Sequence, residues 1–259
     1  MCLIAFANHV HPNYPLLLLA NRDEFYMRPT RNAQFWTSEL HPEILAGKDL
    51  QAGGTWLGIT KTGKWAALTN YRDIRNIKPN APSRGEIVLH LLQTNISPEK
   101  YLMQISKNAK EYNGFNLLVG DKTGIFHYSN ESDKITVIED GIYGLSNALL
   151  NTPWPKLQSA KNELAKCIHE NNLTPSSLFG ILNNENLADD TQLPQTGLSV
   201  EMERAVSPIF IKTEKYGTRC SSILMIDKSG KVNFIERSFI PGQKTVAAEQ
   251  SFEFYIPIK

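Results

Sequence analysis

The sequence predicts an α+β fold, with antiparallel sheets and helices packed outside them, from three observations. Apolar segments follow one another in the order strands, helices, strands, helices, strands. Neighbouring strand-like segments are joined by short turn sequences such as KTGK at 61–64, which is typical of β-hairpins. Runs such as LLLLA (16–20) are apolar at successive positions, which indicates strands buried on both faces, as where two sheets stack beneath helical layers.

The N-terminal part predicts two hairpins. CLIAFANHV (2–10) and LLLLANRDE (16–24) flank the turn sequence HPNYP, so we expect them to pair. Residues 25–54 carry scattered proline and polar residues, which predict irregular structure. WLGIT (56–60) and WAALTN (65–70) form the second hairpin.

Two helices are predicted next. Ser83 with Glu86 three residues later matches a capping box, and apolar residues at 87, 88, 91 and 92 form one stripe. Ser97 followed by Pro98 is typical of a second helix start.

The C-terminal part alternates between strands and helices again. Residues 184–206 are polar and predict a surface excursion. The strands are expected at 115–120, 125–129, 134–139, 142–147, 220–227, 231–239 and 252–256, and the helices at 154–168 and 174–182.

Composition narrows the function classes. A chain of 259 residues with 41% hydrophobic and 20% charged residues is ordinary for a globular protein, and its net charge of +1 with scattered basic residues argues against a nucleic-acid partner. The apolar run at 16–20 is too short to span a bilayer, and the absence of a basic segment before it argues against a secretory signal. Three cysteines without a CxxC motif fit a reducing, cytoplasmic compartment. We expect no metal and no cofactor.

Cys2 has two interpretations. Removal of Met1 would leave a cysteine with a free α-amine, whose ordinary pKa near 8 lets it act as the base for its own thiol. Alternatively, Cys2 is a small apolar residue that opens a buried strand, since free cysteine is among the most buried residue types.

Polar residues at strand ends are the candidate partners of Cys2. NRDE (21–24) ends the strand expected to pair with the Cys2 strand, so an acid there could hold the α-amine and Arg22 could favour a thiolate. Asn70 and Asn147 each end a strand and are either turn formers or donors to an oxyanion. Arg219 precedes a buried strand, where it is either a partner of Cys2 or an ordinary surface arginine.

In combination these motifs resemble a known family. MCLIAF, NRDEFYMRPT, AGGTWLGI…ALTNYRD, SRGE, GLSN…PWPK and YGTRCSSIL occur in this order across nearly the whole chain. They are similar to the NRDE family, also called the transport and Golgi organisation protein 2 family. The resemblance implies a single domain over residues 1–259.

That family is in turn similar to N-terminal nucleophile hydrolases of the choloylglycine hydrolase and penicillin V acylase type. The likeness implies a four-layer αββα sandwich and a processed N-terminal cysteine. By this likeness Cys2 matches the nucleophile, Asn70 and Asn147 match the two asparagines, and Arg219 matches a late arginine.

The likeness is imperfect at the NRDE motif. The hydrolases space an arginine and an aspartate three residues apart, whereas Arg22 and Asp23 are adjacent and would face opposite ways on a regular strand. Both are nevertheless expected in the site, with Glu24 as the substitute acid.

Two functions follow from the resemblance. The first is hydrolysis of a non-peptide linear amide C–N bond in a small molecule with an acyl or apolar part. The second is non-catalytic binding and trafficking of haem or of an acyl-CoA or other lipid on the same fold. The sequence does not indicate an oligomeric state.

Overall fold

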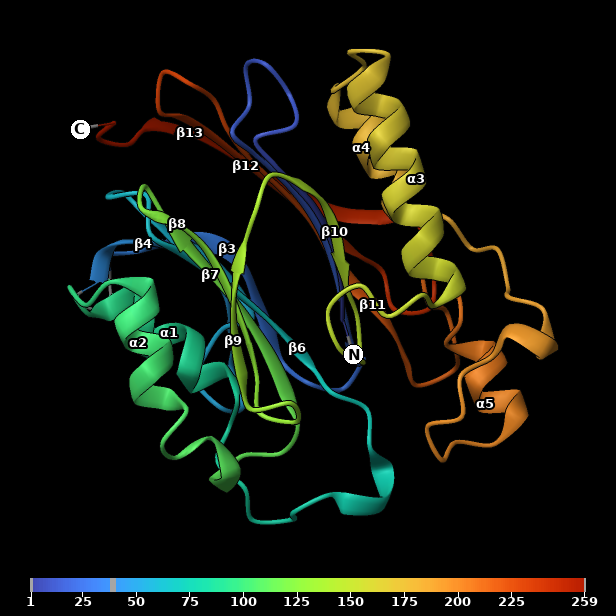
Figure 1. The fold of residues 1–259 in the computed structure, drawn as a ribbon. Coiled ribbons are helices and arrows are strands. Elements are labelled where there is room, and N and C mark those ends of the chain that lie inside the picture. The colour runs from blue at the N-terminus through green and yellow to red at the C-terminus, as the bar shows by residue number, and fades with distance from the viewer. Residues whose placement is uncertain (1, 38–40, 259) are drawn as a thin grey trace.

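The protein forms two antiparallel sheets that stack face to face with helices on both outer sides (Figure 1). The structure, a computed structural model, describes residues 2–37 and 41–258. Sheet A has the strand order β10-β1-β2-β11-β12-β13. Its strands are β1 (Cys2–Asn8), β2 (Leu16–Phe25), β10 (Gly141–Leu145), β11 (Tyr216–Ile226), β12 (Lys231–Phe239) and β13 (Val246–Tyr255).

Sheet B follows the chain order, from β3 to β9. Each strand pairs with its sequence neighbour in antiparallel orientation. Short turns join β5 to β6, β7 to β8 and β8 to β9, whereas α1 and α2 lie between β6 and β7. The strands are β3 (Thr30–Trp36), β4 (His41–Asp49), β5 (Leu57–Thr60), β6 (Trp65–Asn70), β7 (Phe115–Asp121), β8 (Gly124–Ser129) and β9 (Lys134–Ile138).

The helices form the outer layers. Helices α1 (Gly85–Gln93) and α2 (Pro98–Ile105) cover sheet B, while α3 (Pro155–His169) and α4 (Pro175–Leu182) cover sheet A. A short helix, α5 (Val200–Ala205), lies within the segment that links α4 to β11. Within the described ranges, no helix is both long and apolar enough to cross a membrane.

Three apolar cores separate the four layers. Ile4 and Phe6 on β1 point between the sheets, whereas the alternate residues Leu3 and Ala5 pack beneath α3 and α4. A strand that is buried on both faces must be apolar at successive positions, which explains the continuous runs in β1 and β2. The predicted four-layer αββα arrangement is therefore confirmed.

Two local predictions were wrong. Residues 25–54 contain β3 and β4, although the sequence predicted irregular structure there. Register shifts interrupt their pairing between 31 and 34 and again between 35 and 36, so the side chains lose the period-two pattern of a regular strand. The capping box at Ser83 does not form, because α1 begins at Gly85 without a side-chain cap.

Candidate active site around Cys2

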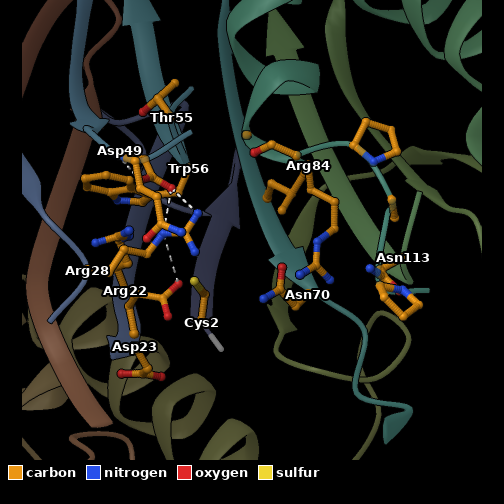
Figure 2. A pocket seen from close by; sticks show the side chains of 18 residues that line it. Cys2, Arg22, Asp23, Arg28, Asp49, Thr55, Trp56, Asn70, Arg84 and Asn113 are labelled. Carbon is orange, nitrogen blue, oxygen red and sulfur yellow. Dashed lines mark hydrogen bonds and ion pairs between the residues drawn. The ribbon is translucent and has the colours of Figure 1, made fainter. Parts of the chain in front are cut away.

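Cys2 lies in the wall of an open cavity of about 420 Å³ (Figure 2). The cavity is formed where the start of β1 and the end of β2 meet the end of β6 and the start of α1. Strand β1 therefore brings the second residue of the chain to a partly exposed position with room for a ligand.

Arg22 lies directly opposite Cys2. The two residues are paired in the antiparallel register of β1 and β2, so their side chains share the face that points toward sheet B. The Arg22 guanidinium carbon lies 4.2 Å from the centre of the Trp56 ring, and Nη1 donates a hydrogen bond of 2.8 Å to Thr30 Oγ1. These contacts hold a buried positive charge beside the thiol.

Asp23 lies on the opposite face of β2, as the alternation of a regular strand requires. Its carboxylate is 2% exposed and accepts a hydrogen bond of 2.6 Å from Thr218 Oγ1. A bulge does occur here, but it lies in β11, between Thr218 and Cys220, and leaves the pairing of β1 with β2 regular.

The electrostatics of Cys2 reflect both neighbours. Burial raises the pKa of the Cys2 thiol, and the Asp23 carboxylate raises it further. The Arg22 guanidinium and a hydrogen bond from the backbone N–H of Asp23 lower this pKa. Because the effect of burial is the largest, the thiol needs a base to become a nucleophile at neutral pH.

The two candidate asparagines have different surroundings. Asn70 ends β6 with its side chain in the cavity wall, and that amide makes no hydrogen bond to the described residues. Asn147 is buried outside the cavity wall, and its Nδ2 donates a hydrogen bond of 2.8 Å to the Asn70 carbonyl. Asn147 is therefore placed to hold the backbone of Asn70.

Arg219 is the extra residue of the β11 bulge, and its side chain does not line the cavity. Its Nη1 donates to the carbonyl oxygens of Phe25, Tyr26 and Arg28 at 2.9–3.0 Å. Arg219 therefore fastens the turn that follows β2, close to the site but outside its wall.

Arg84, in the SRGE motif, is a cavity residue that the sequence reasoning did not select. It precedes α1 and reaches the cavity because the two glycine-containing motifs touch. A Cβ on Gly54 would collide with the carbonyl group of Gly85, so only glycine lets the backbone approach this closely. The motifs GGTW and SRGE thus form one wall together.

A buried cluster of charged residues lies behind Asp23, and the sequence analysis did not predict it. Lys156 is buried, its Nζ donates a hydrogen bond of 3.0 Å to the Val206 carbonyl, and burial lowers its pKa to about 8. The Asp23 carboxylate partly offsets this shift. Arg72 and Glu203 form a buried ion pair at 2.5 Å. No local pattern distinguishes these residues, although Lys156 does end the PWPK motif.

The fold resembles a solved hydrolase. A mutant of the conjugated bile acid hydrolase from Clostridium perfringens superposes with a TM-score of 0.53 and 11% identity, over 98% of this chain and 92% of that chain. At this identity the likeness shows the fold alone, and it confirms the predicted N-terminal nucleophile hydrolase-like sandwich.

Sequence comparisons give the family. The chain is 37% identical to the Transport and Golgi organization 2 homolog of Mus musculus, over 98% of this chain and 99% of that protein. It is 38% identical to the human Transport and Golgi organization protein 2 homolog with the same coverage. The profile of the Transport and Golgi organisation 2 family matches residues 1–241. This chain therefore belongs to the Transport and Golgi organisation 2 family, as its motifs indicated.

Proposed function

We propose that the protein is a cysteine N-terminal nucleophile hydrolase that cleaves a non-peptide linear amide C–N bond. The position of Cys2 carries the proposal: it is the first residue of β1, it lines an open cavity, and Arg22 lies opposite on the same face. The fold shared with a protein named as a conjugated bile acid hydrolase is consistent with this reaction.

The first step is activation of the thiol. Removal of Met1 leaves Cys2 with an α-amine of ordinary pKa near 8, which takes the thiol proton directly or through one water. Asp23 orients the resulting ammonium, since its carboxylate lies close enough to raise the pKa of Cys2. Arg22 favours the thiolate by its positive charge.

The thiolate then forms a bond to the carbonyl carbon of the amide. The Asn70 amide donates to the resulting oxyanion, which suits a donor that the described residues leave unoccupied. Collapse of the intermediate breaks the C–N bond, and the ammonium of Cys2 returns its proton to the leaving amine. Water hydrolyses the thioester, releases the acid and restores the thiol.

Intact mass spectrometry tests this mechanism. Protein purified after expression should lack Met1, and incubation with a library of acyl amides and thioesters should add the mass of one acyl group. Cys2→Ser should abolish turnover, whereas Cys167→Ser, which changes a buried cysteine on α3, should leave the adduct unchanged. Active protein that retains Met1 would contradict the mechanism.

A second candidate function is carriage of an apolar ligand. A cavity of about 500 Å³ adjoins the Cys2 cavity, and its wall combines large apolar side chains with charged ones, which supports binding of haem or of an acyl-CoA. Titration with both ligands separates the two functions. Binding that survives Cys2→Ala, with no turnover of any amide, favours the carrier.

A further inference from the structure

Arg84 stands out among the arginines of the Cys2 cavity. Arg28 is paired with Asp49 at 2.7 Å, and Arg22 is covered by Trp56. Arg84 Nη1 donates only to the Gly114 carbonyl, at 2.9 Å, and no described carboxylate lies within ion-pair distance of it. Burial lowers the pKa of Arg84, and the Glu24 carboxylate in the same cavity only partly offsets this shift, so the fold keeps a partly desolvated positive charge that no carboxylate contacts directly.

The position of Arg84 suits a ligand. Arg84 and Asn70 lie on the same side of the cavity, facing the side that carries Cys2 and Arg22 (Figure 2). Helix α1 begins at the next residue, so the positive end of its dipole adds to the charge of the guanidinium. An anionic group in the cavity would be bound by a fork of N–H donors, the geometry that matches carboxylate and phosphate.

Arg84 also lines a second cavity, part of whose wall is apolar. Arg84 and Asn70 line both the Cys2 cavity and the adjoining cavity of about 500 Å³. The outer wall of that second cavity includes Phe25, Ile77 and Met202, which are 60%, 60% and 48% exposed. Large apolar side chains gathered around one hollow are typical of a ligand site.

We propose that Arg84 binds the carboxylate or phosphate group of an amphiphilic ligand, whose apolar part occupies the adjoining cavity. This deepens the proposed function, on which it rests only in taking the Cys2 cavity as a ligand site. The substrate or cargo is then an anionic amphiphile, with its charged group on the wall that faces the thiol.

Calorimetric titration of Cys2→Ser protein tests the site without turnover. The probes are decanoate, decyl phosphate and uncharged decanol, each below its micelle concentration. Arg84→Gln should weaken binding of both anions at least tenfold, about 1.4 kcal/mol, and leave decanol unchanged. Arg75→Gln, which removes the same charge from an exposed residue outside both cavities, should change none of the three. Ile77→Asp should weaken all three.

The comparison of decanoate with decyl phosphate identifies which anion the site prefers. Unchanged anion affinity in folded Arg84→Gln protein, or an equal loss for decanol, would overturn the proposal. If Arg84→Gln does not melt cooperatively, the salt dependence of ligand binding to the parent protein tests the site instead. Anion affinity should fall between low and high salt while decanol affinity stays constant, and equal behaviour of the two would again overturn the proposal.

Hydrolysis and anion binding can fail separately. Binding of decanoate without any acyl adduct on the parent protein would retain the site and reject the hydrolase. An adduct with an anionic acyl amide such as an N-acylglycine, formed equally by the parent protein and by Arg84→Gln, would retain the hydrolase and reject the site.

Discussion

The Glu203→Ala variant should unfold at a markedly lower denaturant concentration than the wild type. The side chains of Arg72 and Glu203 are 5% and 3% exposed and lie 2.5 Å apart. Alanine at 203 leaves the Arg72 guanidinium buried without a counter-charge, which costs about 3–5 kcal/mol in comparable pairs. Glu203 also accepts hydrogen bonds from the backbone and hydroxyl of Thr196, so the loss should lie toward the upper end.

The same segment offers a matched control. Arg204 and Asp190 also form an ion pair at 2.5 Å, but their side chains are 39% and 55% exposed. Asp190→Ala should therefore cost less than about 1 kcal/mol, because water screens the pair and solvates the remaining charge. The exposed pair makes two contacts, at 2.5 and 2.7 Å, and the buried pair one, at 2.5 Å. A larger loss at Glu203 therefore reflects burial and the Thr196 hydrogen bonds, and not a better ion-pair geometry.

Urea denaturation followed by tryptophan fluorescence measures both variants. The Arg72 guanidinium carbon lies 5.0 Å from the centre of the Trp154 ring, so this indole should report the opening of the pair. A loss of stability in Glu203→Ala no larger than that in Asp190→Ala would contradict a dominant cost of the buried, unpaired Arg72 charge. Replacement of both Arg72 and Glu203 by methionine should recover much of the stability, because no buried charge remains.

Three further predictions concern separate elements. Gly54→Ala should lower stability by about 1–3 kcal/mol, because the added Cβ collides with the backbone at the start of α1. Gly180→Ala in α4 should raise the melting temperature, because the added Cβ meets no atom within 4 Å and alanine favours the helix. Lys156 has a folded pKa of about 8, below its unfolded value, so the unfolded state binds more protons between about pH 8 and 10.4. The free energy of unfolding of the wild type should therefore rise with pH across this window relative to that of Lys156→Met. At 1.36 kcal/mol for each unit of pKa, the rise is up to about 3 kcal/mol. Parallel plots of unfolding free energy against pH for the two proteins would contradict this. Arg219→Ala should speed proteolysis at the turn after β2, since three carbonyl contacts are lost, and cleavage at the wild-type rate would argue against that role.

Part of the fold could be predicted because several pairs of neighbouring strands are joined by short turns, although β1 with β10 and β2 with β11 pair across much of the chain. Hairpins with short turns fix antiparallel neighbours, and residues at the ends of paired strands must then lie together, as Cys2 and Arg22 do. Strands β3 and β4 could not be predicted in this way. Their register shifts erase the alternation by which a strand is recognised in sequence.

The candidate site was predictable only in part. Strand ends pointed to Asn70, whereas the bulge that directs Arg219 onto the turn after β2 leaves no signal in the sequence. Arg84 reaches the cavity through the contact of Gly54 with Gly85, 31 positions along the chain, and Glu203 pairs with Arg72 across 131 positions. Such encounters depend on how whole layers pack, which local propensity does not encode.

The place of β1 in sheet A has a consequence for biosynthesis. Strand β1 is made first, yet it is an interior strand between β2 and β10, and Ile4 pairs with Leu145. During synthesis, one edge of the β1–β2 hairpin has no partner until about 140 residues have emerged. The other edge, on β2, has no partner until β11 is made. An apolar hairpin with open edges is prone to wrong pairing, so the nascent chain should depend on chaperones until β10 and β11 are added. The residues that line the Cys2 cavity all precede residue 114, so the whole lining is synthesised before the strands that complete sheet A.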